Sequence, residues 1–139
     1  MNKYIDELLK LADQAESIGD IPVGAIVVKE DKIIGKGFNN RVLTKNPTNH
    51  AEVNAINEAC KYINDWRLNG CDLYVTLEPC DMCLEIIKEA RINNVYFLLE
   101  NNEKHKYKRT NVCRYRIDDD ICQKYRLKIS NFFEKNLNR

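Results

Sequence analysis

The sequence predicts an α/β fold with three layers, α-β-α, in which helices enclose a central mixed sheet of five strands. Two patterns predict it. Strand-like apolar runs alternate with segments of helical periodicity, which favours parallel strands joined by helices. The first two strand-like runs are separated only by Glu30 and Asp31, as in an antiparallel hairpin. We expect residues 1–139 to form a single domain, because this length leaves no room for two independent cores.

The N-terminal half supplies a helix, the hairpin and a second helix. Residues 3–18 place apolar side chains at helical spacing, and Gly19 ends that helix. Residues 22–28 and 32–38 are the hairpin strands, and the polar residues 39–49 form a loop. A helix over residues 50–63 follows, and its buried stripe consists of Ala51, Ala55, Ile56, Ala59, Cys60 and Ile63.

Strands and helices continue to alternate in the second half. Pro79 opens a helix that runs to about Ala90, because proline is well tolerated in a first turn. Residues 95–99 are all apolar and therefore predict a buried strand. The other elements expected there are a strand over 71–77, a polar loop over 101–112, a strand over 113–117 and a closing helix over 121–137.

Charge is balanced in total but not along the chain. The formal net charge is +1, yet residues 1–103 carry 11 basic and 17 acidic side chains, and residues 104–139 carry 11 basic and 4 acidic ones. A basic C-terminal quarter fits either a polyanionic partner or a solvated surface. The longest apolar runs, Ala25–Val28 and Val95–Leu99, are too short to span a membrane, so we expect a cytoplasmic protein with no membrane partner.

Three residues have the types and spacing of a zinc site. Cys80 and Cys83 are three apart at the start of a helix, so both thiolates can reach one metal ion. His50 adds a nitrogen donor from the start of another helix. One histidine and two thiolates are a ligand set with which zinc keeps a fourth position for water. The sequence therefore predicts one Zn²⁺ per chain with catalytic potential.

Glu52 is the candidate proton shuttle of this site. A carboxylate near the activated water can take protons from it and deliver them, one to a ring nitrogen and one to a leaving amine. Residues two apart point to different sides of a regular helix, but in a first turn both His50 and Glu52 can lean toward the mouth of the site.

Two other interpretations of the cysteines stay open at this point. A closed structural zinc site would need a fourth protein ligand, and a thiol–disulfide pair would use Cys80 and Cys83 without His50 and Glu52. The candidates for a fourth ligand are Cys60, Cys71, Cys113, Cys122 and His105, none of which has metal-ligand spacing to the other three.

His50-x-Glu52 followed by Pro79-Cys80-x-x-Cys83 is the signature of zinc-dependent nucleobase deaminases. The surrounding segments make the chain similar to the bacterial tRNA-specific adenosine deaminases of the cytidine/deoxycytidylate deaminase superfamily. Those segments are Ile21–Val27, Gly37–Asn39, Asn46–Glu52, Trp66–Leu68, Leu73–Cys83 and, in the last helix, Ser130–Phe133.

The resemblance implies a cytidine-deaminase-like fold, a homodimer, and conversion of adenosine to inosine at the wobble position of a tRNA anticodon. By position, His50, Cys80 and Cys83 would bind zinc and Glu52 would shuttle protons. The residues implied in substrate binding are Asn39, the backbone N–H of Ala51, and Val23 as a pocket wall. Without the resemblance, Asn39 would be interpreted as a turn residue after a strand.

One segment departs from the family. The tRNA deaminases usually carry a stretch ending in Lys-Thr-Gly-Ala after the strand equivalent to residues 95–99, and residues 100–109 contain no such motif here. Deamination of a free base or nucleoside, such as cytosine, guanine or cytidine, is therefore the alternative activity. A zinc module that binds nucleic acid without turnover is a third class, against which Glu52 argues.

Basic residues of the C-terminal quarter are candidates for contact with the anticodon arm. Phosphate contacts supply most of the affinity for nucleic acid, and Tyr107 and Tyr115 are interleaved with these residues and could stack on unpaired bases. The candidates are Lys104, Lys106, Lys108 and Arg109, together with Arg114 and Arg116.

Overall fold

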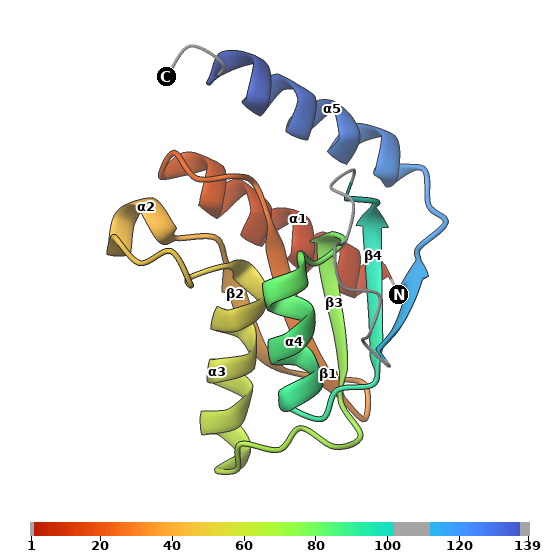
Figure 1. Ribbon diagram of the computed structural model, residues 1–139. Coiled ribbons are helices and arrows are strands. Elements are labelled where there is room, and N and C mark those ends of the chain that lie inside the picture. The colour runs from red at the N-terminus through yellow and green to blue at the C-terminus, as the bar shows by residue number, and fades with distance from the viewer. Residues whose placement is uncertain (1, 102–111, 137–139) are drawn as a thin grey trace.

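The computed structural model describes residues 2–101 and 112–136, and a mixed five-stranded sheet forms their centre (Figure 1). The strand order is β2-β1-β3-β4-β5. β1 is antiparallel to both of its neighbours, whereas β3, β4 and β5 are parallel to one another. The strands are β1 (Gly24–Lys29), β2 (Lys32–Phe38), β3 (Asp72–Leu77), β4 (Asn94–Leu99) and β5 (Cys113–Arg116).

Helices cover both faces of the sheet and so confirm the three-layer fold. α3 (Ala51–Ile63) and α4 (Asp81–Glu89) pack on one face, and α1 (Asn2–Ser17) and α5 (Ile121–Lys135) pack on the other (Figure 1). Each face has its own buried cluster, one centred on the strands with α3 and α4, the other on the strands with α1 and Tyr125 of α5. Among the described residues no helix combines the length and the apolar character needed to span a membrane.

The predicted hairpin is confirmed, and its turn explains the tight connection. Glu30 and Asp31 both have positive φ, 50° and 63°, as a two-residue hairpin turn matching the twist of its strands requires. β1 then lies between β2 and β3, so that β2 and β3 run parallel although they are not neighbours. The two strands joined by α3, β2 and β3, are therefore parallel as predicted, but β1 lies between them.

The segment predicted as a polar loop, residues 39–49, contains one helical turn, α2 (Arg41–Thr44). Asp20 explains it. Its buried carboxylate accepts hydrogen bonds from the Val42 N–H at 3.1 Å and from the Arg41 guanidinium at 3.0 Å. Burial by itself would raise the pKa of Asp20, but these hydrogen bonds, with one from the Ile21 N–H, lower it below its usual value. The carboxylate therefore stays charged and holds α2 against the start of β1.

Two glycines let α3 approach β2 closely. A Cβ at Gly37 would lie 2.3 Å from the carbonyl oxygen of Ala51, and one at Gly35 would lie 2.3 Å from that of Ala55. No side chain fits at such a distance, so the backbones of strand and helix are in direct contact. This contact sets the position of the first turn of α3.

The helices that begin near the site start slightly later than predicted. α3 begins at Ala51 with His50 as its N-cap, and α4 begins at Asp81 with Cys80 as its N-cap. Pro79 therefore precedes the cap instead of opening the helix. The difference matters, because a cap residue has extended backbone and its side chain is free to face outward from the helix end.

Candidate metal and catalytic site

The candidate site lies at the carboxyl end of β3, where two helices begin. His50 and Cys80 have extended backbone conformations, with ψ of 156° and 172°, immediately before α3 and α4. Neither side chain caps its own helix, so both are available to a ligand. The free N–H groups and partial positive charge of helix N-termini stabilise thiolates and developing anions.

Three donor atoms meet between these helix starts. His50 Nδ1, Cys80 Sγ and Cys83 Sγ all lie within 4.8 Å of one another, and His50 Nδ1 is 3.9 Å from Cys80 Sγ. Zinc–sulfur and zinc–nitrogen bonds of about 2.3 and 2.0 Å in a tetrahedron separate such atoms by roughly 3.6–3.8 Å. The cluster therefore fits one zinc ion with only slight closing of the three side chains.

The structure argues against both alternative interpretations of the cysteines. Cys80 and Cys83 share their cluster with His50, which a thiol–disulfide pair does not require. Among the described residues, no fourth protein ligand joins the cluster, which leaves a coordination position open. The cysteines that stay outside the cluster are Cys60, Cys71, Cys113 and Cys122, and His105 lies outside the described residues.

Protons in this cluster are distributed unequally. Hydrogen bonding from the Cys83 thiol, and then from His50, lowers the pKa of Cys80 to about 4. The same hydrogen bond, together with burial, raises the pKa of Cys83, and the contact with Cys80 raises that of His50. Cys80 is thus a thiolate at neutral pH. Binding of a metal ion by all three groups would displace the protons of Cys83 and His50, because metal ligands must be deprotonated.

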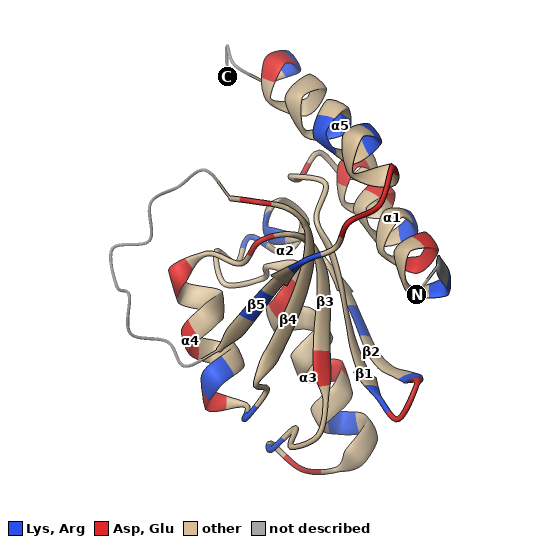
Figure 2. Ribbon diagram, turned by 90° about the vertical axis from the view of Figure 1, so that its right-hand side faces the viewer, with Lys and Arg blue, Asp and Glu red and all other residues tan. Residues whose placement is uncertain are grey.

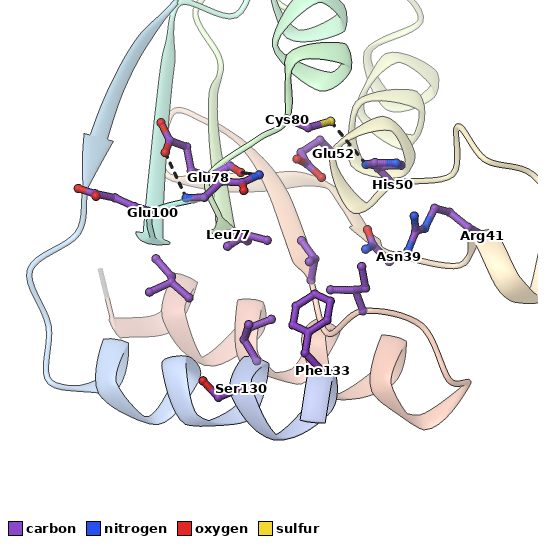
Figure 3. Close-up of a pocket in the computed structure, with 15 residues that line it drawn as sticks. Asn39, Arg41, His50, Glu52, Leu77, Glu78, Cys80, Glu100, Ser130 and Phe133 are labelled. Carbon is purple, nitrogen blue, oxygen red and sulfur yellow. Dashed lines mark hydrogen bonds between the residues drawn. The ribbon is translucent and has the colours of Figure 1, made fainter. Parts of the chain in front are cut away.

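Glu52 is buried beside the cluster, with only 4% of its surface exposed. Burial is the largest cause that raises its pKa, to about 7, and the negative charge of Cys80 adds to the effect. Figure 3 shows its carboxylate beside the His50–Cys80 pair, on the wall of the pocket. A carboxyl group with a pKa near 7 both accepts and donates protons readily at neutral pH.

A pocket of about 620 Å³ opens in front of these residues. It mixes apolar walls with polar groups, as small-molecule sites do. Its lining comes from the start of β1, the segment around α2, the starts of α3 and α4, the end of β4, and α5. The lining residues are Ile21, Val23, Asn39, Arg41, His50, Glu52, Leu77, Glu78, Cys80, Leu99, Glu100, Asn101, Ile129, Ser130 and Phe133.

Of the three implied substrate-binding residues, two line the pocket and the third, Ala51, lies behind Asn39. Val23 and Asn39 both line the pocket, and Asn39 is 4% exposed. Ala51 is fully buried, and its N–H donates to Asn39 Oδ1 at 2.7 Å instead of pointing to an open position. This bond fixes the amide of Asn39 and leaves its Nδ2 with no hydrogen-bond partner in the described part of the chain.

Sequence reasoning missed the pocket residues that depend on contacts between distant segments. Arg41 is held by Asp20, and Phe133 projects from α5 into the pocket (Figure 3). Glu78 pairs with Arg114 at 3.5 Å and also accepts a hydrogen bond from the Asn101 N–H. The similarity of Ser130–Phe133 to the family's last helix was a signal for α5, but no local pattern connected Asp20 with Arg41.

Some predicted RNA contacts cannot be placed. Lys104, Lys106, Lys108 and Arg109, with Tyr107, lie outside the described residues. Arg114 and Arg116 are on β5, and Arg114 is engaged by Glu78.

The mixed sheet is flanked by helices, and at one end of it a histidine and two cysteines meet beside a buried glutamate, as in a zinc-binding region. The chain belongs to the family described as the cytidine and deoxycytidylate deaminase zinc-binding region, which it matches over residues 1–99. Within that family it is similar to the tRNA-specific adenosine deaminase of Aquifex aeolicus, with 48% identity over 94 residues, or 68% of this chain and 62% of that protein. The chain spans about three fifths of the length of the curated relatives it matches.

Solved structures agree with the sequence relatives on the fold. One comes from a study of A-to-I editing by tRNA:A34 deaminases, with a TM-score of 0.77 and 28% identity, covering 84% of this chain and 98% of that one. Another is the guanine deaminase from Bacillus subtilis, with a TM-score of 0.68 and 28% identity, covering 94% and 93% of the two chains. The two structures share the fold but are named for different substrates.

Proposed function

We propose that this protein is a zinc-dependent hydrolase that deaminates adenosine to inosine at the wobble position of a tRNA anticodon. The observation that carries the proposal is the position of Glu52, buried on the wall of the same pocket as His50 and Cys80. A zinc module that only binds nucleic acid has no use for a carboxylate there. The relatives named for tRNA adenosine deamination support the choice of substrate.

In this proposal His50, Cys80 and Cys83 hold one zinc ion per chain. Zinc held there lowers the pKa of a water molecule and so supplies the nucleophile that attacks the carbon bearing the exocyclic amine. Glu52 accepts a proton from that water and passes it to the neighbouring ring nitrogen. It then carries the second proton of the water to the amine, which leaves as ammonia while the carbonyl of inosine forms.

The pocket walls would orient the flipped nucleoside. Val23 and Phe133 provide apolar surface for the base and ribose. Asn39 would donate a hydrogen bond from Nδ2 to an acceptor of the purine, because its Oδ1 is already used by Ala51. The Ala51 N–H therefore contributes by fixing the side chain of Asn39. It would contact the base directly only through a bifurcated hydrogen bond that Asn39 Oδ1 also accepts.

Deamination of a free base is the second candidate function. It is favoured by the similarity to a guanine deaminase structure, which extends over 94% of this chain. Glu100 adds a carboxylate to the pocket lining, where it could accept hydrogen bonds from an amino group of a purine.

The proposed partners are the tRNA anticodon arm and a second copy of the chain, and a tRNA substrate would place the protein in the cytoplasm. Lys104, Lys106, Lys108 and Arg109 remain the proposed RNA contacts. If the homodimer interface involves α4, Met82 is the apolar side chain available to it, because Met82 is 37% exposed whereas Leu84 and Ile87 are buried within the chain. Light scattering should report about twice the 16.3 kDa of one chain. A monomer at micromolar concentration would exclude the dimer.

The substrate is tested by offering the purified protein several candidates in parallel. An anticodon stem-loop with adenosine at position 34, cytosine, cytidine and guanine are incubated separately, and release of ammonia is measured. We expect turnover of the stem-loop only. Turnover of guanine or cytosine without turnover of the stem-loop would reject tRNA as the substrate and support the free-base alternative. Elemental analysis of the same preparation should give one zinc per chain.

A further inference from the structure

A second, smaller cavity of about 240 Å³ adjoins the catalytic pocket. The two share a common wall made of Leu99 and Glu100 at the end of β4 and of Ile129 and Ser130 on α5. The smaller cavity extends from this wall toward β5 and the first turns of α5, where it is lined by Leu98, Arg116, Cys122, Gln123 and Arg126. A group bound in it would therefore be adjacent to whatever occupies the catalytic pocket.

Two arginines give this cavity an excess of positive charge. Arg116 and Arg126 are both exposed, and neither has an ion-pair partner among the described residues. Other basic side chains near the pocket are neutralised: Arg41 by Asp20, and Arg114 by Glu78. Figure 2 shows basic segments on both β5 and α5.

The remaining lining agrees with a bound anion. Glu100 is the acidic side chain that lines the cavity, so two positive charges face one negative charge. Gln123 and Ser130 add an amide and a hydroxyl, which can donate hydrogen bonds to anionic oxygens. The volume lies below the roughly 300–1,000 Å³ of ordinary small-molecule pockets. It suits a compact anion with some water better than a second nucleoside.

We propose that this cavity is a phosphate subsite, in which Arg116 and Arg126 bind a phosphate group next to the nucleoside in the catalytic pocket. The inference rests on the proposed deaminase function of that pocket and adds a way to recognise its substrate. Guanidinium groups bind phosphate through paired, charge-assisted hydrogen bonds, which fix position as well as sign of charge. The subsite makes the enzyme select a phosphorylated substrate over a free base. The phosphate comes either from an RNA strand or from a free nucleotide.

The test is a thermodynamic cycle between single arginines and single phosphates. Anticodon stem-loops are prepared in which one linkage within two nucleotides of the target adenosine is a neutral methylphosphonate. Their binding is measured by fluorescence anisotropy in a Glu52→Gln background, which prevents turnover. The variants are Arg116→Gln and Arg126→Gln. Lys124→Gln is the matched control, because Lys124 is exposed on α5 but lines neither cavity.

We expect one of the neutral linkages to weaken binding about tenfold when both arginines are present, as loss of a charge-assisted contact should. In Arg116→Gln and Arg126→Gln the same linkage should change binding by no more than about twofold, whereas Lys124→Gln should retain the tenfold effect. If every linkage has the same effect in all variants, the subsite does not exist. Equal zinc content and equal thermal unfolding of the variants exclude misfolding as a cause.

Adenosine and adenosine 5′-monophosphate distinguish the source of the phosphate and separate this inference from the proposed function. Activity is measured in the protein that retains Glu52. If this protein releases no ammonia from the stem-loop, tRNA deamination is rejected. The subsite is still supported if the monophosphate binds more tightly than adenosine and loses that advantage in Arg126→Gln. If the stem-loop is deaminated but no phosphate couples to either arginine, the function is supported and the subsite is rejected.

Discussion

Tyr125 of α5 connects the last helix to the sheet, and its removal should be measurable as a large loss of stability. Its side chain is 1% exposed, and its hydroxyl donates to the Pro22 carbonyl at 2.7 Å and accepts from Thr76 Oγ1 at 2.9 Å. Thr76 Oγ1 in turn accepts from the Gly24 N–H at 3.2 Å. Burial raises the pKa of Tyr125, so the hydroxyl keeps its proton and can donate at any working pH.

Tyr125→Phe removes two buried hydrogen bonds and changes the shape of the core very little. Each bond contributes about 1 kcal/mol net. The Pro22 carbonyl loses the donor that Tyr125 supplies, and the Thr76 hydroxyl loses its acceptor, both in an apolar site. The free energy of unfolding should therefore fall by about 2–3 kcal/mol. Urea denaturation at constant zinc should show this as a midpoint lowered by about 1 M, since slopes for proteins of this size are about 1–3 kcal/mol per M.

Thr76→Val provides the control, because it interrupts the same chain of hydrogen bonds at its next member. If the network acts as one unit, the double variant Tyr125→Phe/Thr76→Val should be more stable by about 1 kcal/mol than the sum of the single losses predicts. A loss below about 0.5 kcal/mol for Tyr125→Phe, or strict additivity of the two changes, would refute the network.

Further predictions concern the site, the pH response and the packing of α3. Glu52→Gln should retain zinc by elemental analysis and lose about 10²–10⁴-fold in turnover, whereas Cys83→Ala should lose zinc; a zinc-free Glu52→Gln would contradict the role of that residue. The lowered pKa of Asp20 means that its contribution to stability is present above its unfolded pKa and is lost as pH falls through the folded value, so Asp20→Asn should reduce the difference in unfolding free energy between pH 7 and pH 3. Gly37→Ala should lower the thermal midpoint and the turnover together, because its Cβ would meet the Ala51 carbonyl at 2.3 Å; an unchanged midpoint would mean that α3 can shift freely.

Local patterns predicted most of the fold because each depends on residues close in sequence. The hairpin followed from Glu30 and Asp31, and the two helices at the site followed from their apolar spacing. The one-turn helix α2 was missed, because the N–H of Val42 at its start donates to the carboxylate of Asp20, 22 residues earlier in the chain. The insertion of β1 between β2 and β3 is a property of the whole sheet, which single-segment periodicity does not contain.

The candidate site was also predicted only in part: the metal-binding residues were predicted, and most of the pocket walls were not. The motif around His50, Glu52, Cys80 and Cys83 identified the donor cluster, because the chemistry of zinc restricts residue types and spacing strongly. Apart from Val23 and Asn39, which the resemblance implied, the pocket walls could not be predicted, since they come from segments that meet only after folding. Phe133, for example, lines the pocket only when α5 packs on the face of the sheet opposite α3 and α4.

The contact of Tyr125 with Pro22 joins residues 103 positions apart, and this has a consequence for how the chain folds during synthesis. On the ribosome, α5 is synthesised after every other described element, and the 49 residues between Thr76 and Tyr125 take about 2–10 s to translate. Until α5 docks, the sheet face under it and the side of the pocket formed by Ile129, Ser130 and Phe133 are open to water. The last described helix to be synthesised is therefore the one that closes this side of the pocket.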